Sequence, residues 1–306
     1  EMASRQHMLT ITPVIEQGLR DAGVGYDDLD AIAVTYGPGL AGSLLVGVNA
    51  AKAVAFARDI PLVGINHLEG HIYANWLIPS NLEPGMAPPA EPEFPLLTLI
   101  VSGGHTELVL ATDHGKYRML GCTIDDAAGE AFDKIARAVG LGYPGGPLLD
   151  RASQGGRTDA IRLPRTDFPD SLDFSFSGLK TAALNQLQRL QQQAQRQNQS
   201  WQDIVPLCDF AASYQQAIVD VLVDHTFRAL EKHGLSHLAL AGGVAANSCL
   251  RRCMAERAAA LGIRMTCPPP DLCTDNAAMI AAAGYFAFRS GRRDDLALNA
   301  FASLEL

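Results

Sequence analysis

The sequence of 306 residues has little charge, and most of that charge is negative. Charged residues make up 19% of the chain, and its formal net charge is −9. This balance excludes a generic nucleic-acid-binding protein that works through overall positive charge, so a contact with RNA would need a local basic patch or a helper protein. Apolar runs of membrane-spanning length are also lacking, and we therefore expect no membrane segment.

Cysteine motifs are missing as well. The six cysteines include no CxxC pair and no compact framework of the kind that holds together a small secreted domain. We therefore expect reduced, mostly buried thiols in a cytoplasmic protein.

What the sequence does contain is an alternation of strand and helix signals. Apolar runs predict strands at 31–35, 61–65, 96–101 and 238–241, and helical spacing predicts helices between them. This alternation predicts an α/β protein whose ligands lie near strand ends, and the chain is long enough for two lobes. The segment 79–95, rich in Pro, Glu and Ala, is typical of a surface connection between lobes.

His67 and His71 are the first candidate site. Four residues apart on a helix, they share one face and can bind a metal ion together. Glu69 lies two residues from each and points to the other side, so the pair differs from the HExxH motif of metalloproteases. Asp275 is a candidate third ligand. The alternatives are that the histidines pack by chance or lie on the surface, and that Thr274 or Asp275 caps the next helix.

Two glycine turns follow buried strands. Ser102, Gly103 and Gly104 offer backbone amides and a hydroxyl to a phosphate or carboxylate. The second turn, at 242–248, carries Asn247, which could hydrogen-bond a ribose or base. Ordinary turns are the alternative interpretation, and because the GxGxxG spacing is absent we predict no dinucleotide site.

Carboxylates gather at 125–133, where we expect a helix with acids on its first turn. Three or four carboxylates so close together are more than capping requires, although an ion pair could explain any single one of them, since Asp133 lies next to Lys134 and three residues from Glu130. A rigid Gly/Pro loop at 140–147 precedes the helix that bears Asp150, which suggests close approach to a ligand.

Two further segments lie between these motifs and the last helices. The serines of 174–181 are expected to cap a helix whose Lys180 could neutralise phosphate or simply lie on the surface. The glutamine-dense segment 185–202 predicts a helical extension or a mobile insertion without chemistry.

In this order and spacing, the motifs resemble the TsaD family of tRNA threonylcarbamoyladenosine transferases, formerly called Gcp. The resemblance covers essentially the whole chain. Its landmarks are GPGLAGSLLVG (37–47), NHLEGH (66–71), LIVSGGHTEL (99–108), AGEAFDKIAR (128–137), GYPGGPLLDRAS (142–153), FSFSGLKTA (174–182), GGVAANSCLR (242–251) and TDNAAMIAAAG (274–284).

The resemblance implies an α/β protein with the actin-like ATPase (ASKHA) fold, in which two RNase H-like lobes enclose a ligand cleft. The first lobe would comprise residues 1–94 and a C-terminal helix at 275–306, and the second would comprise 95–274 with an insertion around 185–202. The N-terminal strand and hairpin usual in the family have no counterpart in this sequence, so we expect the first lobe to lack those strands.

The resemblance also implies an acyltransferase. It would transfer a threonylcarbamoyl group from threonylcarbamoyl-AMP to N6 of adenosine 37 in tRNAs that read ANN codons, with TsaB and TsaE as partner proteins and the donor made by TsaC. The alternatives are a metal-dependent glycoprotease, which is the older label of the family, and a non-catalytic scaffold of the TsaB type. No side chain stands out as a general base.

Matched position by position, the metal ligands of the family fall on His67, His71 and Asp275, which would hold one Fe²⁺ or Zn²⁺ ion. The substrate-binding positions of the family fall on Ile100, Val101, Ser102, Gly103, Gly104, Asp133, Gly146, Asp150 and Asn247.

Overall fold

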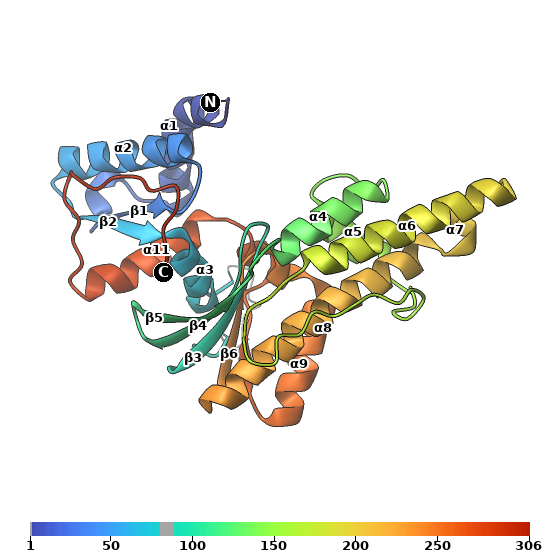
Figure 1. Cartoon of the computed structure of the whole chain (residues 1–306). Coiled ribbons are helices and arrows are strands. Elements are labelled where there is room, and N and C mark those ends of the chain that lie inside the picture. Colours follow the sequence, from blue (N-terminus) through green and yellow to red (C-terminus); the bar gives the residue numbers. More distant parts are fainter. Residues whose placement is uncertain (1, 80–88) are drawn as a thin grey trace. The chain divides into compact units, whose positions relative to one another are not determined.

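The computed structural model describes residues 2–79 and 89–306, which form two compact units (Figure 1). Unit 1 comprises residues 1–78 and 275–306, and unit 2 comprises residues 79–274. Part of the expected connection at 79–95 lies outside the described residues, because 80–88 are not among them. Within the described part of the chain, no helix combines the length and the apolar character needed to cross a membrane.

Unit 1 is built from two parallel strands and the helices around them. The strands are β1 (Ile32–Gly37) and β2 (Leu62–Asn66). The helices and 3-10 turns are α1 (Met2–Ala22), η1 (Tyr26–Asp28), α2 (Ala41–Arg58), α3 (His67–Tyr73), η2 (Ala74–Trp76) and α11 (Ala277–Arg289).

Helices α2 and α11 cover opposite faces of this strand pair, because neighbouring side chains of a strand point to opposite sides. A Cβ added to Gly284 of α11 would lie 2.4 Å from the Cβ of Ala33, and one added to Gly47 of α2 would lie 3.8 Å from Val34. Small residues on both helices therefore let them approach the strands closely.

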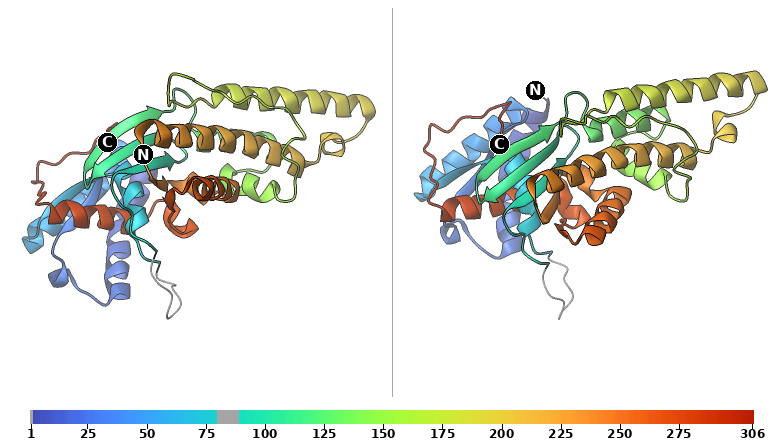
Figure 2. Two further views of the ribbon diagram at one scale, coloured as in Figure 1. Left: turned by 90° about the horizontal axis from the view of Figure 1, so that it is seen from below. Right: turned by 60° about the horizontal axis from the view of Figure 1, so that its bottom comes forward.

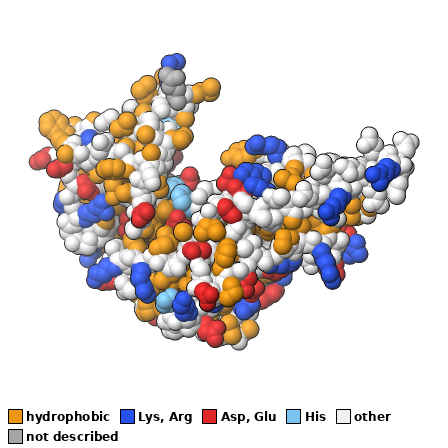
Figure 3. Space-filling model, in the orientation of Figure 1, with side chains coloured by type: hydrophobic (Ala, Val, Ile, Leu, Met, Phe, Trp, Pro, Cys, Tyr) orange, Lys and Arg blue, Asp and Glu red, His pale blue; other side chains and the backbone are white. Residues whose placement is uncertain are grey.

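Helix α1 contributes no buried residue to unit 1. Apolar side chains such as Met8, Leu9 and Phe56 are exposed on α1 and α2, and Figure 3 shows the orange of apolar side chains over this part of unit 1. The apolar side chains of α1 are therefore not buried within unit 1.

The C-terminal segment 275–306 is helical only in its first part, because α11 ends at residue 289. The residues that follow run back to the strand pair, where the amide of Asp294 donates to the carbonyl oxygen of Leu62 at 2.8 Å. Further on, the amide of Phe301 donates to the carbonyl oxygen of Tyr36 at 2.8 Å. The prediction of a helix throughout this segment was therefore wrong after residue 289.

Unit 2 contains a mixed five-stranded sheet in the order β5-β4-β3-β6-β7. The strands are β3 (Leu96–Val101), β4 (Thr106–Asp113), β5 (Lys116–Cys122), β6 (His237–Ala241) and β7 (Arg264–Thr266). The helices and 3-10 turn are α4 (Ala128–Ala138), α5 (Gly145–Ala152), α6 (Ser177–Gln197), α7 (Trp201–Ile204), α8 (Leu207–His233), η3 (Gly243–Ala246), α9 (Ser248–Leu261) and α10 (Pro270–Cys273).

The order of pairing in this sheet places two loops at one edge. Strands β3 and β4 are antiparallel and form a hairpin, whereas β3 and β6 are parallel. The carboxyl ends of β3 and β6 consequently lie at the same edge, and the loops that follow them start side by side. The four predicted strands are all present, and residues 185–197 continue α6 as the predicted helical extension.

The core of unit 2 packs helices α4, α6, α8 and α9 against the sheet. Figure 2 shows α6 and α8 extending from the sheet in the same general direction in both views. Tyr214 of α8 is fully buried, lies edge-on to Phe132 of α4, and donates its hydroxyl to the carbonyl oxygen of Ala131 at 3.0 Å. Burial raises the pKa of this phenol.

The six cysteines are free thiols, of which Cys249 and Cys273 are buried and the others partly buried.

Candidate metal centre and substrate-binding residues

The two histidines lie where a buried strand ends in a short helix. Every residue of β2 is buried, and its last residue, Asn66, begins α3 by accepting a hydrogen bond from the amide of Leu68 at 2.8 Å. His67 and His71 follow on one face of α3, with their ring centroids 4.8 Å apart. His71 is 2% exposed, so the strand and its cap fix this imidazole inside unit 1.

Asp275 comes to the histidines from the start of α11. Asn276, rather than Thr274 or Asp275, caps this helix, because its side chain accepts from the amide of Met279 at 2.8 Å. The capping alternative for Asp275 was therefore wrong. Oδ1 of Asp275 lies 3.3 Å from Nε2 of His67 and 3.2 Å from Nε2 of His71.

Gly70 makes this approach possible. A Cβ added to Gly70 would lie 2.6 Å from Cδ1 of Ile280 in α11. A side chain at this position would have to displace the end of Ile280, which packs here between α3, the helix of the two histidines, and α11, the helix that follows Asp275. Stacking of Tyr73 on Phe286, with centroids 5.2 Å apart, holds the same two helices together one turn further on.

The three side chains form a donor set that suits a metal ion. One ligand atom from each of His67, His71 and Asp275 lies within 4.8 Å of the others, and among the described residues no other such group of three is found. Hydrogen bonds from His67 and then His71 lower the pKa of the Asp275 carboxyl, so this carboxylate stays ionised. Two imidazoles and one carboxylate, with Asp275 largely exposed, match a catalytic site that keeps open positions.

The substrate positions expected on the first glycine turn lie at the end of β3. Ile100 and Val101 are its last residues and are fully buried. In the turn, the Ser102 hydroxyl accepts hydrogen bonds from the amides of Gly104 at 3.3 Å and His105 at 3.1 Å. A Cβ added to Gly103 or Gly104 would meet nothing within 4 Å, so space beside this turn is open.

Two other glycines hold this turn against neighbouring elements. The amide of Gly129, in the first turn of α4, donates to the carbonyl oxygen of Ser102 at 3.2 Å. Gly242, which follows β6 with φ of +87°, would place an added Cβ 2.5 Å from the carbonyl oxygen of Val101. The two predicted glycine turns are therefore in contact at one edge of the sheet.

Asp133 and Gly146 lie on the next pair of helices. Oδ1 of Asp133 in α4 accepts a hydrogen bond from the amide of Gly145 at 2.6 Å. Gly145 packs directly on the backbone of Asp133, whereas Gly146 faces open space. Asp133 thus fixes the start of α5. The ion-pair alternative is confirmed for Glu130, which binds Lys134, and not for Asp133, because Lys134 binds Asp126 and Glu130.

Asp150 and Asn247 each form hydrogen bonds with residues at the start of α9. The carboxylate of Asp150 accepts from the Ser248 amide at 3.1 Å and from the Ser248 hydroxyl at 2.7 Å. The Asn247 side chain caps α9 by accepting from the amide of Leu250 at 2.9 Å, and it donates to Gln215 at 2.7 Å. Sequence reasoning missed Ser248 and Gln215, although a polar residue in the apolar run 210–230 signals a buried hydrogen-bond partner.

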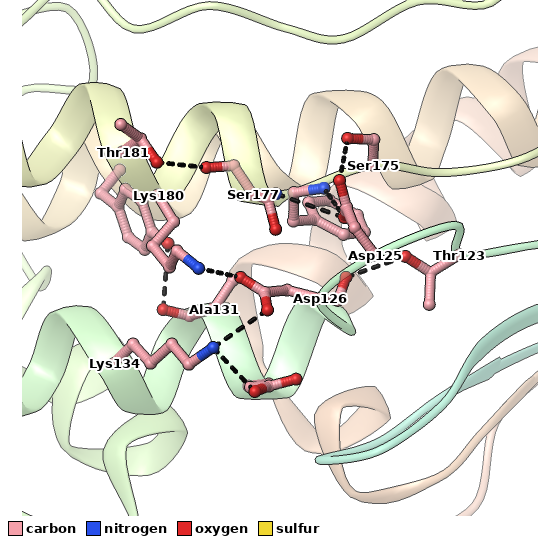
Figure 4. A network of polar contacts seen from close by, with 12 residues as sticks. Thr123, Asp125, Asp126, Ala131, Lys134, Ser175, Ser177, Lys180 and Thr181 are labelled. Atoms are coloured by element: carbon pink, nitrogen blue, oxygen red, sulfur yellow. Dashed lines mark hydrogen bonds and ion pairs between the residues drawn. The ribbon is translucent and has the colours of Figure 1, made fainter.

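The carboxylates at 125–126 precede α4 instead of lying on its first turn, so that part of the helix prediction was wrong. Figure 4 shows what they do: Asp125 accepts from the Ser175 hydroxyl and from the amides of Phe176 and Ser177, which start α6. No serine side chain caps this helix, and the predicted serine caps were therefore wrong.

Asp126 occupies the centre of the same network. It accepts from Lys134 at 2.9 Å and forms an ion pair with Lys180 (Figure 4). Burial raises the pKa of this carboxyl, but hydrogen bonds from Lys180, Lys134 and Ser177 outweigh burial and lower the pKa to about 2. Lys180 is therefore paired with a carboxylate rather than lying free on the surface.

Solved structures with a similar fold include HypF proteins. Full-length HypF aligns with a TM-score of 0.60 at 13% identity, over 90% of this chain and 41% of the HypF chain. The HypF of T. kodakarensis aligns with a TM-score of 0.56 at 14% identity. At these identities the likeness concerns the α/β fold alone.

Sequence relatives cover the whole chain. A tRNA N6-adenosine threonylcarbamoyltransferase of Symbiobacterium thermophilum is 53% identical over all 306 residues and 84% of its own length. One of Dehalococcoides mccartyi is 52% identical over all of this chain and 86% of its own length. The model of the TsaD family, described as tRNA N6-adenosine threonylcarbamoyltransferase, matches residues 1–282. With the histidine and glycine motifs in their expected places, this chain belongs to the TsaD family of tRNA N6-adenosine threonylcarbamoyltransferases, which are acyltransferases.

Proposed function

We propose that this chain transfers a threonylcarbamoyl group from threonylcarbamoyl-AMP to N6 of adenosine 37 in tRNAs that read ANN codons. In this step the amine nitrogen bonds to the carbamoyl carbon, the bond from that carbon to the phosphate oxygen breaks, AMP leaves, and the amine loses a proton. The observation that carries the proposal is the convergence of His67 and His71 on the carboxylate of Asp275 in a chain of this family.

His67, His71 and Asp275 would hold one Fe²⁺ or Zn²⁺ ion, since two nitrogens and one carboxylate suit either. Such an ion, when bound, supplies Lewis-acid polarisation of carbonyl or phosphate oxygens. The chain contributes the positioning: Asn66 and Gly70 fix the helix of the histidines, and Asn276 begins α11 so that Asp275 stays free to bind.

The donor would be held along the sheet edge of unit 2. The Gly103 amide would face the charge that develops on the donor, where a preorganised backbone donor is most effective. The amides of Ser102 and Gly104 instead hold the turn in shape, because they donate to the His105 carbonyl oxygen and to the Ser102 hydroxyl. Asp133, Gly146, Asp150 and Asn247, with Ile100 and Val101 behind the turn, would hold the adenylate. Open space beside Gly103, Gly104 and Gly146 supports this assignment.

The finer architecture is part of the same proposal. Units 1 and 2 would correspond to the two RNase H-like lobes of an actin-like ATPase fold. The net charge of −9 provides little phosphate neutralisation, so we expect tRNA modification to depend on TsaB and TsaE, with the donor made by TsaC, in the cytoplasm.

Reconstitution with these partners and tRNA tests the proposal. His67→Ala and Asp275→Ala should each lower the amount of bound metal and reduce the rate of transfer at least about ten-fold. Mutations of residues that merely orient metal ligands already have effects of this size, and these variants remove a ligand itself. His7→Ala is the matched control, since His7 lies on exposed α1 with only the carbonyl oxygen of Ala3 as its partner in that helix. Undiminished transfer by both ligand variants would refute the metal-assisted mechanism.

A further inference from the structure

Gln215 is a polar residue in the most buried part of α8. Its side chain is 4% exposed and lies in a helix whose neighbouring turns are filled by buried apolar residues. A primary amide in such surroundings is costly unless its donor and its acceptor are both satisfied. Its two partners therefore show why glutamine is placed there.

Both partners lead to residues of the proposed donor site. Oε1 of Gln215 accepts from Nδ2 of Asn247 at 2.7 Å, and its Nε2 donates to the Ser153 hydroxyl at 2.9 Å. That hydroxyl in turn donates to the carbonyl oxygen of Asp150 at 2.7 Å. Ser248, next to Asn247, closes the ring by donating twice to the Asp150 carboxylate.

We propose that Gln215 is a positioning residue for the donor, because it sets the spacing between Asp150 on α5 and Asn247 at the start of α9. The inference rests on the proposed function, which assigns these two residues to the adenylate. Gln215 acts through them and is not assigned a contact with the donor.

The chemistry of the ring requires an amide at this position. Oε1 fixes the orientation of the Asn247 amide, whose oxygen is already committed to the amide of Leu250. Nε2 directs the Ser153 hydroxyl toward the backbone of Asp150. Methionine has a similar length but can do neither, so Gln215→Met removes both constraints without adding charge.

Gln216 offers a matched control one residue away. It is partly buried, donates to Asp220 at 2.7 Å and accepts from the Cys249 thiol at 3.5 Å. It has the same chemistry in the same helix, but it contacts neither Asp150 nor Asn247 through these bonds. Gln216→Met therefore reports what the loss of a glutamine in α8, together with its bond to the thiol of Cys249 in α9, does without a direct effect on Asp150 or Asn247.

The experiment measures AMP affinity by titration calorimetry, and donor KM and kcat in the reconstituted reaction, for both glutamine variants. Gln215→Met should raise the AMP Kd and the donor KM at least about five-fold, the lower range for one lost buried hydrogen bond. The kcat at saturating donor should fall less than this. Gln216→Met should leave these constants unchanged, and thermal midpoints should be recorded for both variants.

Two further variants separate this inference from the proposed function. If Asp150→Ala and Asn247→Ala weaken AMP binding but Gln215→Met does not, positioning by Gln215 is refuted and the donor site stands. The same holds if Gln215→Met lowers only the thermal midpoint. If neither Asp150→Ala nor Asn247→Ala affects AMP binding, the assignment of these residues to the donor site is refuted, and the positioning role of Gln215 is refuted as well.

Discussion

Replacing Asp126 by Asn should remove a pH-dependent part of the stability of this protein. The Asp126 side chain is 13% exposed and binds two lysines, Lys134 of α4 and Lys180 of α6. Asparagine keeps the size of the side chain but loses the charge that both ammonium groups face. The variant therefore tests the ion pairs and leaves the packing in place.

The magnitude follows from the pKa of the carboxyl. Folding lowers the pKa of Asp126 from 3.8 to about 2, and each pKa unit corresponds to about 1.4 kcal/mol, so the ionised group contributes about 2 kcal/mol. Because the folded pKa is the lower one, this stability is fully present above pH 3.8 and is lost as the pH falls toward 2. About 1 kcal/mol should be lost between pH 5 and pH 3.

Urea unfolding of both proteins at several pH values between 3 and 7 measures this directly. The difference in unfolding free energy between wild type and Asp126→Asn should be largest above pH 5 and should shrink by about 1 kcal/mol at pH 3. Asp113→Asn is the control, since Asp113 pairs with Lys116 in the open, where solvent screens the interaction. A difference for Asp126→Asn that is constant across this range would refute the reasoning.

Two glycine substitutions test close contacts elsewhere. Gly70→Ala should destabilise unit 1 by about 1 kcal/mol or less and change its metal content little, because its new Cβ meets only Cδ1 of Ile280, the movable end of a side chain. Gly18→Ala is the control, and it should be neutral or slightly stabilising because Gly18 lies in open space on α1. Chemical unfolding and metal analysis of Gly70→Ala and Gly18→Ala compare the two variants. Gly242→Ala should destabilise more than Gly262→Ala in urea unfolding: both have positive φ, but only Gly242 lies against the backbone at the end of β3. Equal losses would show that backbone strain alone matters at both positions.

Much of the fold could be predicted from apolar runs, because strands such as β3 and β6 are buried at every position and apolar at all but one each, Thr98 and His237. Strand β5 gave no such signal, since most of its side chains are exposed or partly buried at the sheet edge. The segment after α11 was misread as helix for a related reason. Its residues are held by backbone hydrogen bonds to β1 and β2, and no sequence pattern records bonds to a partner so far away in the chain.

The candidate metal centre was predicted more completely than its surroundings. The spacing of His67 and His71 places both on one face of α3, and Asp275 was already considered as their third ligand. Which residue caps α11 could not be decided, because Thr274, Asp275 and Asn276 are all good capping residues in sequence. The structure assigns the cap to Asn276, which leaves the carboxylate to the histidines.

Glycine contacts explain why the remaining site geometry stayed hidden in the sequence. Gly70, Gly129, Gly145 and Gly242 each lie where an added Cβ would come within 3 Å of another element, and each such contact joins elements that carry candidate site residues. Gly18 and Gly262, which have open space around them, look the same in sequence. A glycine motif therefore indicates that the backbone is approached closely by another group. The sequence does not tell whether that group is a ligand or another segment of the chain. At Gly103 and Gly146 no described residue lies within 4 Å of an added Cβ. The same is true of Gly18 and Gly262, so it is the place of Gly103 and Gly146 in the substrate-binding motifs, and not the open space alone, that makes them candidate donor positions.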